Sequence, residues 1–584
     1  MSVKVLLKVF MLCGGLAFFL YGMNVMSSGL TKLAGGSLER SLKRMTSNRF
    51  KAMGLGAGIT IAIQSSSAMT VMLVGLVNSG IMQLGQTIGV IMGSNIGTTL
   101  TPWIFSLSGV DGSGWIALLK PENFSPVIAL IGIVLILMSK KQRRKDIGKI
   151  LIGFSVLMYG MTLMGNSVEG LDKSPAFTSV LTAFENPLLG VLVGAVFTGI
   201  IQSSAASVGM LQTLAMTGTI SYGVAIPIIM GQNIGTCVTA LISAIGVSKN
   251  ARKVSVVHIC FNLIGTIVCL ILFFGANAVV GFSFTDKPIG PAGIALCHTI
   301  FNVVTTAMLC PFTKQLEKLA NAIVRPTKKE RGSAFLDERL LVSPGVAVNE
   351  AEAMTRKMAL LAQQTVNAAM DLAETYSDKA AEEVEKNETE LDGYEDKLGS
   401  FLARLAERSM SANDSRRASK LLHSIGDFER LGDHALHLVT AATEIHDKKI
   451  VFSEQAQAEL CNLRDALQKI ISLTVTCFSE DDVAVAQRVE PLEQVIDALI
   501  AKAKNGHIER VMQGKCTIQT GFVHADLLAN YERISDHCSN IAVSVIEGAS
   551  GSFDSHRYLN EVKQSGSSHF SEYFSQYAEQ YGIF

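Results

Sequence analysis

Two apolar stretches of the 584-residue chain, 138 positions apart, are near copies of each other. Residues 56–101 and 194–239 align without a gap, and 22 of the 46 aligned positions are identical. Both copies hold a Gln-Ser-Ser triplet and a Gly-x-Asn-Ile-Gly-Thr motif inside otherwise hydrophobic sequence. Duplicated apolar segments that are interrupted by polar residues are typical of membrane transporters whose two halves share one substrate site.

Charge divides the chain into two regions, although its formal net charge is zero. Residues 1–320 hold 22 Lys and Arg against 9 Asp and Glu, whereas residues 321–584 hold 28 against 41. Apolar segments joined by basic loops indicate a multi-pass membrane domain in the first region. We therefore expect an all-α protein with a transmembrane domain at 1–320, a linker at 321–345 and a soluble helical domain at 346–584.

The distribution of Lys and Arg among the loops predicts the orientation of the membrane segments. Loops 32–51, 140–149 and 249–253 are basic, so we expect them in the cytoplasm. Loops 106–124 and 166–187 are poor in basic residues, so we expect them outside.

The apolar segments 52–79 and 188–217 fit this orientation only if each enters the membrane and returns on the same side as a re-entrant hairpin. The Gln-Ser-Ser triplet falls in the middle of each segment, where such a turn is expected. Repeat 1, about 5–105, and repeat 2, about 147–246, are then inverted relative to each other, with one span at 125–139 between them. Inverted repeats with facing hairpins predict a binding site near the midplane of the bilayer.

The duplicated motifs carry the groups that a small oxyanion and a sodium ion need. Hydroxyls, amides and the N–H groups freed at a helix break donate hydrogen bonds to an oxyanion. Carbonyl and hydroxyl oxygens suit sodium. We expect both the Gln-Ser-Ser and the Gly-x-Asn-Ile-Gly-Thr stretches to be unwound, so that one region serves both ligands.

The membrane segments contain almost no charged residues, so a dehydrated anion there needs co-bound cations. This favours cation-coupled transport over a bare anion pore. The alternative is that the small polar residues serve helix packing. Packing is a sufficient explanation for a single Ser-Ser pair, but a weaker one for two motifs duplicated in register.

A second pair of polar motifs follows the duplication. His258 and Asn262 are four residues apart, as are His298 and Asn302, so each pair shares one helical face. These residues either form a polar path or gate, or make hydrogen bonds between the last two spans. The second interpretation is the simpler one.

The paired Gln-Ser-Ser and Gly-x-Asn-Ile-Gly-Thr motifs resemble those of the sodium–phosphate cotransporter family in its bacterial form, over roughly residues 1–320. The resemblance implies sodium-coupled movement of inorganic phosphate. It assigns the phosphate and sodium sites to Gln64, Ser65, Ser66, Ser67, Asn95, Thr98, Gln202, Ser203, Ser204, Asn233 and Thr236. The second copy has Ala205 where the first has Ser67, and Cys237 where the first has Thr99. The halves are therefore unequal, and which half holds each ion is left open.

The C-terminal region is also duplicated. Residues 384–392 match 489–497, and residues 428–438 match 531–541. This pattern predicts two homologous three-helix units and resembles the PhoU phosphate-regulator family. The family's Glu-x-x-x-Asp motif corresponds here to Glu429, Asp433, Glu532 and Asp536.

The four-residue spacing places both carboxylates of each pair on one helical face. If the two helices pack together, the four carboxylates cluster as a divalent metal requires, and His434 and His537 are further candidate ligands. A solvated charged surface explains the same residues equally well, because Arg430 and Arg533 lie beside the carboxylates in the sequence.

Together these features predict a phosphate transporter of the cell inner membrane that works by alternating access. Sodium is its co-substrate, and a cytoplasmic PhoU-like domain modulates it. Assembly into a homo-oligomer is left open. Nucleic acid is not an expected partner, because the basic residues are scattered over short loops. An enzyme is not expected either, since the membrane segments lack a nucleophile–base pair and the chain has no P-loop.

Two alternative functions retain the phosphate site. In the first, the same site exports phosphate or acts as a homeostatic valve. In the second, the protein is a membrane receptor that binds phosphate without moving it.

Overall fold

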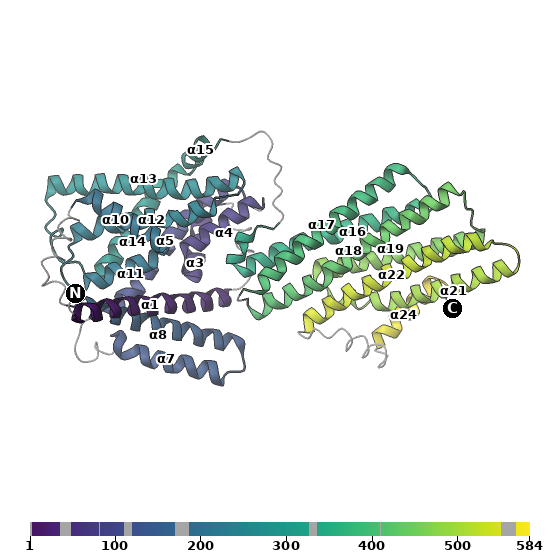
Figure 1. Cartoon of the computed structure of the whole chain (residues 1–584), viewed down its shortest axis with the longest axis horizontal. Helices are drawn as coiled ribbons and strands as arrows, with labels where there is room; N and C mark the ends of the chain where they lie inside the picture. The colour runs from purple at the N-terminus through teal and green to yellow at the C-terminus, as the bar shows by residue number, and fades with distance from the viewer. Residues whose placement is uncertain are drawn as a thin grey trace. The chain divides into compact units, whose positions relative to one another are not determined.

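The computed structural model describes residues 3–34, 48–80, 82–109, 120–169, 186–325, 336–408, 410–550 and 568–583. The chain forms two compact units, of which the first runs to Ala347 and the second begins at Val348 (Figure 1). The loops 32–51, 106–124 and 166–187 lie largely outside the described residues, as does part of the linker expected at 321–345.

The first unit contains the predicted membrane segments. Its helices are α1 (Val3–Ala34), α3 (Arg49–Ile63), α4 (Ser66–Asn78), α5 (Leu84–Gly97), α6 (Leu100–Ser106), α7 (Pro121–Met138), α8 (Gln142–Val168), α10 (Pro187–Ile201), α11 (Ser204–Ala215), α12 (Tyr222–Ser243), α13 (Lys249–Val280), α14 (Pro291–Leu309) and α15 (Thr313–Ile323). A 3₁₀ helix, η5 (Glu338–Val342), follows them.

Five helical stretches are long and apolar enough to cross a membrane, and they are Leu6–Leu33, Gln142–Val168, Tyr222–Ser243, Lys249–Val280 and Pro291–Ile323. The two segments predicted as hairpins, 52–79 and 188–217, contain no helix of this length. Each is divided into two helices of 12 to 15 residues. A helix that crosses the hydrocarbon core needs about 20 residues. None of these four helices can therefore span a bilayer by itself.

Helices α1 and α8 lie side by side in the first unit (Figure 1). Gly15 of α1 lies against Gly160 of α8, and Gly22 lies against Gly153, so the two helices run antiparallel. A Cβ atom on Gly22 would lie 2.3 Å from the main-chain nitrogen of Leu157. This close approach is possible only because glycine has no side chain.

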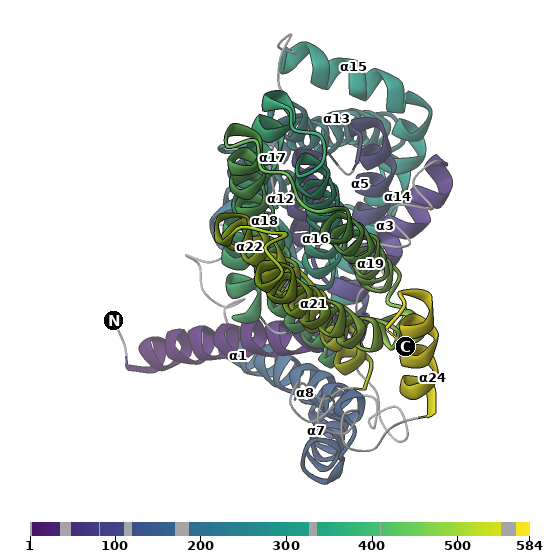
Figure 2. The ribbon, with the colours of Figure 1, turned by 90° about the vertical axis from the view of Figure 1, so that its right-hand side faces the viewer.

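The second unit is a bundle of long helices, seen nearly end-on in Figure 2. They are α16 (Pro344–Leu372), α17 (Asp378–Ala406), α18 (Ala412–Asp447), α19 (Glu454–Glu480), α20 (Val483–Ala486), α21 (Val489–Met512), α22 (Ile518–Ser550) and α24 (Ser568–Gln580). The duplicated sequences lie on α17 and α21, and on α18 and α22. Helices α18 and α22 pack together, and the hydroxyls of Ser424 and Ser544 are hydrogen-bonded at 2.9 Å between them.

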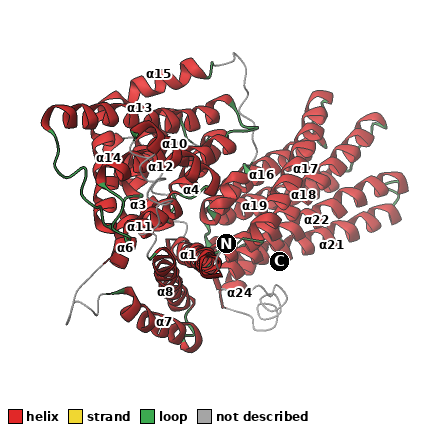
Figure 3. Cartoon of the chain, turned by 60° about the vertical axis from the view of Figure 1, so that its left-hand side comes forward, coloured by secondary structure: helices red, strands yellow, loops and turns green. Residues whose placement is uncertain are grey.

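Within the described ranges both units are almost entirely helical and contain no strand (Figure 3). This confirms the predicted all-α fold. Asparagine begins the equivalent helix in each repeat: the side chains of Asn48 and Asn186 accept hydrogen bonds from the first N–H groups of α3 and α10, as N-cap residues do. These two positions are also 138 residues apart.

Candidate substrate site

Each hairpin turns at the glutamine of its Gln-Ser-Ser triplet. Gln64 follows α3 and Gln202 follows α10, and both adopt the left-handed conformation with φ of 57°. The hydroxyls of Ser65 and Ser203 then accept hydrogen bonds from N–H groups of α4 and α11, at 3.1 and 3.2 Å. The prediction that the helix breaks at both triplets is confirmed.

The left-handed conformation of these glutamines is unusual for residues with a side chain. Only four non-glycine residues in the described ranges have positive φ, and they are Gln64, Gln202, Lys449 and Asp481. This conformation costs an L-residue about 1 kcal/mol or more, and glycine avoids that cost. A glutamine at this position of both turns therefore indicates that its amide is needed there.

In the first copy, backbone contacts fix the direction of both hairpin arms. Gly93 of α5 lies against Met53 of α3, and Gly97 lies against Ala57, so α3 and α5 run parallel. A Cβ atom on Gly93 would lie only 1.9 Å from the carbonyl oxygen of Met53. Because α4 connects the end of α3 to the start of α5, it must return in the opposite direction. Segment 52–79 is thus a helical hairpin.

The second copy repeats this geometry. Gly231 of α12 lies against Val191 of α10, and Gly235 lies against Ala195, so α10 and α12 are parallel and α11 returns between them. A Cβ atom on Gly231 would lie 2.0 Å from the carbonyl oxygen of Val191. Each of these contacts is 138 residues from its counterpart in the first copy, so the duplication extends from sequence to packing.

The free ends of the two hairpins lie beside different elements. At the end of α4, the Asn78 Oδ1 atom accepts a hydrogen bond from the N–H of Ser248 at 2.9 Å, next to the basic loop 249–253. Near the end of α11, the Gln212 amide donates to the carbonyls of Pro102 and Pro291 at 2.9 and 2.8 Å. The end of the first hairpin therefore contacts the turn before α13, and the end of the second contacts α6 and α14.

The Gly-x-Asn-Ile-Gly-Thr motifs differ in local structure. In the first copy the helix stops before Thr98 and restarts as α6, whereas Asn233 and Thr236 lie inside the uninterrupted helix α12. The prediction that this motif is unwound is therefore wrong: Asn233 and Thr236 are helical, and in the first copy Gly93–Gly97 lie in α5, with only Thr98 beyond its end. The helix ends there in the first copy because Pro102 has no N–H for the carbonyl of Thr98. The equivalent position in α12 is Ala240, which permits a continuous helix.

The hairpins are also held differently. In the first copy the Thr60 hydroxyl donates to the Ser94 hydroxyl at 2.7 Å, which ties α3 to α5. In the second copy the equivalent Thr198 donates to Ser207 at 2.8 Å, within its own hairpin. This hydrogen bond thus joins the first hairpin to α5, the helix that carries the first motif. In the second hairpin it joins the two arms, α10 and α11.

The predicted site residues differ in exposure. The buried ones are Ser66, Asn95, Asn233 and Thr236. Gln64, Ser65, Ser67, Thr98, Ser203 and Ser204 are partly buried, and Gln202 is exposed. The Gln64 Oε1 atom accepts a hydrogen bond from Thr101 at 2.9 Å, so the first turn reaches the residues that follow the first Gly-x-Asn-Ile-Gly-Thr motif.

The two repeats meet crosswise at these elements. Helix α4 of the first hairpin contacts α12, which carries the second Gly-x-Asn-Ile-Gly-Thr motif. Helix α11 of the second hairpin contacts α6, which follows the first motif. The first hairpin therefore borders the motif helix of the second repeat, and the second hairpin borders the helix that follows the first motif.

Several buried polar atoms of this region have no hydrogen-bond partner among the described residues, and they are Asn95 Nδ2, Gln212 Oε1, Gln232 Oε1, His258 Nδ1, His298 Nδ1, Asn302 Oδ1 and Thr306 Oγ1. Buried polar groups in proteins are normally hydrogen-bonded to protein or to ordered water. The amide and hydroxyl side chains in this set carry no charge, and a histidine carries one only when it is protonated. Such groups suit a polar ligand, ordered water or both.

The two His–Asn motifs bond first within their own helices. The amide of Asn262 donates to the carbonyl of His258 at 3.1 Å, and that of Asn302 donates to the carbonyl of His298 at 2.9 Å. The Asn262 amide also reaches the Cys237 sulfur at 3.3 Å. Helix α13 is therefore bonded to α12 at Cys237, which stands where the first copy has Thr99. These bonds do not join α13 to α14, so hydrogen bonding between the last two spans stays a prediction.

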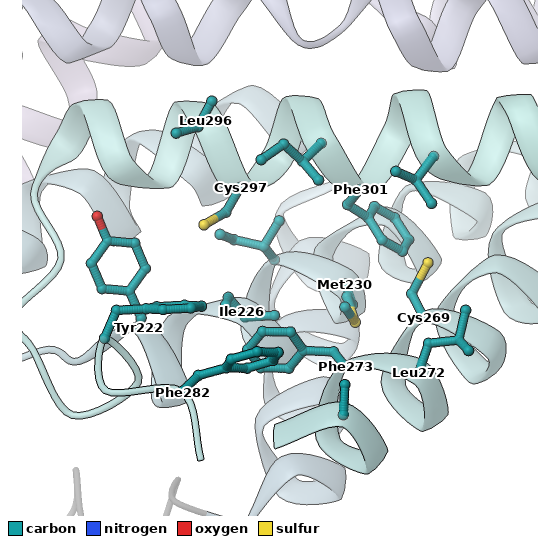
Figure 4. A pocket seen from close by; sticks show the side chains of 15 residues that line it. Tyr222, Ile226, Met230, Cys269, Leu272, Phe273, Phe282, Leu296, Cys297 and Phe301 are labelled. Carbon is teal, nitrogen blue, oxygen red and sulfur yellow. The ribbon is translucent and has the colours of Figure 1, made fainter. Parts of the chain in front are cut away.

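An apolar pocket of about 490 Å³ lies between α12, α13 and α14 (Figure 4). Met230, Cys269, Phe273 and Phe301 line it, together with the ring of Tyr222. Its wall is almost entirely carbon and sulfur, so it offers an oxyanion almost no hydrogen-bond donors. This pocket is therefore not the phosphate site, although Met230 is only three residues from Asn233.

In the second unit, the residues of the Glu-x-x-x-Asp motifs pair with basic side chains. Arg430 lies 3.7 Å from Glu429 and 3.0 Å from Asp433. In the other copy, Lys504 lies 3.0 Å from Glu532, and Arg533 lies 3.5 Å from Asp536. Burial and the neighbouring Asp433 raise the pKa of Glu429, and burial raises the pKa of Asp536.

The histidines beside these motifs lie at the contact between α18 and α22. His434 bonds to Asn530 at 2.9 Å, and His537 bonds to Asp427 at 2.8 Å. Within the described ranges, no three His, Cys, Asp or Glu side chains form a group that fits a metal ion. As placed, the four motif carboxylates and these histidines thus do not fit a divalent metal, and we assign none to them.

The raised pKa of Glu429 predicts a stability effect. Its ionised form is disfavoured in the folded chain, so Glu429→Gln should raise the thermal unfolding temperature at pH 7. The gain should disappear as the pH falls below 4.5, where the wild-type carboxyl is also neutral. Thermal melts of the full-length protein followed by circular dichroism at pH 7 and pH 4 measure both effects.

The control for this prediction is Glu444→Gln, which removes a surface pair with Lys448 and should change stability by about 0.5 kcal/mol or less. A Glu429→Gln variant that is less stable than wild type at pH 7 would contradict the prediction. It would indicate that the carboxylate gains more from a cation than it loses by burial.

Comparison with known proteins assigns both units. Residues 18–166 and 156–285 match the family described as Na+/Pi-cotransporter, and residues 355–442 and 460–545 match the PhoU domain. The two PhoU matches correspond to α16–α18 and α19–α22, in agreement with the predicted pair of three-helix units.

Individual relatives extend over different parts of the chain. The "Putative inorganic phosphate export protein YjbB" of Salmonella typhimurium is 24% identical over 556 residues, 93% of this chain and 98% of that protein. The rat "Sodium-dependent phosphate transport protein 2A" is 37% identical over 105 residues, 18% of this chain and 16% of that protein. A crystal structure of PhoU from Pseudomonas aeruginosa covers 35% of this chain and 97% of its own, at 22% identity and a TM-score of 0.33.

These matches confirm the resemblance that the paired motifs indicate. The N-terminal part of this chain belongs to the Na+/Pi-cotransporter family, and its C-terminal part carries PhoU domains.

Proposed function

We propose that this protein moves inorganic phosphate across the cytoplasmic membrane by alternating access, coupled to sodium, and that its PhoU domains modulate the transport. The observation that carries the proposal is the crosswise contact of the two hairpins, α4 with α12 and α11 with α6. This contact joins the hairpin with one polar turn to the helix of the second motif, and the hairpin with the other polar turn to the helix after the first motif. Two repeats that pack against each other through their hairpins suit a site that alternately opens to either side.

The proposed orientation is inverted for the two repeats. The antiparallel packing of α1 and α8 supports it, since these helices occupy equivalent places in the two copies. The free hairpin ends support it too, because the first lies at the basic loop 249–253 and the second at Pro102 and Pro291. With basic loops inside, the first hairpin opens to the cytoplasm and the PhoU domains lie there as well.

The proposed ligands divide the site by chemistry. Phosphate takes donors from the turns at Gln64 and Gln202, where the first N–H groups of α4 and α11 have no acceptor one turn earlier. Sodium takes carbonyl and hydroxyl oxygens of the same region. The residues proposed for both ligands are Gln64, Ser65, Ser66, Ser67, Asn95, Thr98, Gln202, Ser203, Ser204, Asn233 and Thr236. Co-bound sodium offsets part of the desolvation cost of the anion.

A second candidate function is phosphate export. It is favoured by the relative from Salmonella typhimurium that matches 93% of this chain, because that protein is named as an inorganic phosphate export protein. Export uses the same site, and only the driving gradient differs.

Proteoliposomes loaded with labelled phosphate test the proposal. Under an imposed sodium gradient, we expect phosphate to accumulate on the low-sodium side above its equilibrium level, and replacing sodium by potassium should abolish the accumulation. Flux that is indifferent to sodium would favour an export valve. Phosphate binding without flux would contradict transport and favour a receptor.

A further inference from the structure

The residues that precede the PhoU domains are buried against the first unit. Asp337 is 4% exposed, Leu340 is 0% exposed and Leu341 is 6% exposed. Segments that connect domains usually lie on the surface and remain solvated. We call the segment Asp337–Val342 the strap. The burial of its Asp337, Leu340 and Leu341 side chains requires a specific binding surface within the first unit.

The first part of this surface is the end of the first hairpin. The amide of Asn78, the last residue of α4, donates to a carboxylate oxygen of Asp337 at 2.6 Å. The oxygen of the same amide accepts from the N–H of Ser248, which precedes α13. Asn78 thus links three elements: the hairpin, the turn before α13 and the strap.

The second part is the end of α12. Arg339 donates to the carbonyls of Ser243 and Ile245 at 2.8 and 2.7 Å, and to Asp337 at 3.1 Å. Ser243 is the last residue of α12, so the guanidinium satisfies carbonyls at the negative end of the helix dipole. Arginine suits this position because its planar fork donates to several acceptors at once.

The third part is a glycine of the hairpin arm. A Cβ atom on Gly75 of α4 would lie 3.0 Å from the Leu340 side chain and 3.4 Å from Arg339 Cβ. The equivalent position in the second repeat is Thr213, whose hydroxyl bonds to the carbonyl of Gly209. The docking position for Leu340 is thus a feature of the first hairpin that its copy lacks.

We infer that the strap fastens the first hairpin to the α12–α13 turn, and that the PhoU domains act on transport through it. This inference rests on the proposed function. Only Ser343 separates η5 from Pro344, the first residue of α16, and that helix continues into the second unit. A displacement of α16 is therefore passed directly to the strap. While the strap is bound, α4 is held against α12, so the hairpin cannot move freely.

Releasing the strap tests the inference in the full-length protein. Arg339→Ala removes the bonds to Ser243 and Ile245, and Asn78→Ala removes the bond to Asp337. In each variant we expect faster hydrogen–deuterium exchange at residues 75–79 and an initial phosphate flux in proteoliposomes at least roughly three-fold above wild type, since release frees the hairpin. Arg339→Lys keeps the charge without the fork and should lie between wild type and Arg339→Ala.

Two controls accompany these variants. Val342→Ala alters an exposed strap residue (48% exposed) and should leave exchange and flux at wild-type values. Residues 213–217 of the second repeat serve as an internal reference, where exchange should not change.

The outcomes separate this inference from the proposed function. Unchanged exchange at residues 75–79 in both release variants would overturn the strap, whatever the flux. Faster exchange with unchanged flux would overturn its control of transport, while the proposed function stands. A wild-type protein that moves no phosphate would refute the proposed function and the control of transport with it, while the exchange results would still decide whether the strap holds the hairpin.

Discussion

Replacing Ser66 or Ser204 by alanine is expected to lower the initial rate of phosphate flux roughly ten-fold or more. Both serines are the first residues of the returning hairpin arms, α4 and α11, directly after the left-handed glutamines. Their hydroxyls lie at helix N-termini, where the helix dipole favours an anion. Loss of one donor to a dehydrated anion costs about 1–3 kcal/mol, and 1.4 kcal/mol corresponds to a ten-fold change.

The matched control is Ser155→Ala. Ser155 is also buried in the first unit, but its hydroxyl donates to the carbonyls of Ser125 and Leu151, which lie on α7 and α8. We expect its flux to stay within about two-fold of wild type, because it removes no ligand donor. Near-normal flux in both hairpin variants would contradict the proposed site and leave helix packing as the better explanation of the Gln-Ser-Ser triplets.

Substituting Gly93 or Gly231 by alanine is expected to abolish most of the folded protein. The new Cβ atoms would lie 1.9 and 2.0 Å from the carbonyl oxygens of Met53 and Val191. Main-chain atoms within a helix cannot move aside as a flexible side chain can. The cost should therefore exceed the roughly 1–3 kcal/mol that is usual for overpacking. Size-exclusion chromatography of detergent-solubilised protein measures the loss.

Gly54 and Gly58 provide the controls, because they lie on α3 itself. A Cβ atom on either would meet no other atom within 4 Å. Alanine there should leave the yield unchanged or raise it, since alanine favours a helix over glycine by about 1 kcal/mol. Equal yields from Gly54→Ala and Gly93→Ala would show that the close approach of α3 and α5 is not required for folding.

The two hairpins and the two PhoU units could be predicted because each leaves a signal in the sequence. A polar triplet in the middle of an apolar segment has few structural solutions inside a membrane other than a break in the helix. Repetition at a constant offset then shows that both copies use the same solution. The glycines of the motifs are repeated at the same offset. Their role in the parallel packing of α3 with α5 could be seen only in the three-dimensional structure.

The structure of the second Gly-x-Asn-Ile-Gly-Thr motif could not be predicted from the motif itself. Its six residues do not decide whether the helix continues, because the deciding residue is Pro102 in the first copy and Ala240 in the second. Both lie outside the motif. The strap was also missed, since a short charged segment in a linker reads as solvated surface until its partners on α4 and α12 are known.

The contact between α1 and α8 has a consequence for how such a chain can arise. Gly15 meets Gly160 and Gly22 meets Gly153, and a shift of 138 positions converts each partner pair into the other. The interface is therefore isologous in the sense used for dimers with two-fold symmetry. A half-length ancestor holding one copy would already carry both sides of it, and could assemble as a pair of identical subunits inserted in opposite directions. In the proposed inverted orientation, fusion of two such genes needs one additional crossing segment, the role predicted for residues 125–139.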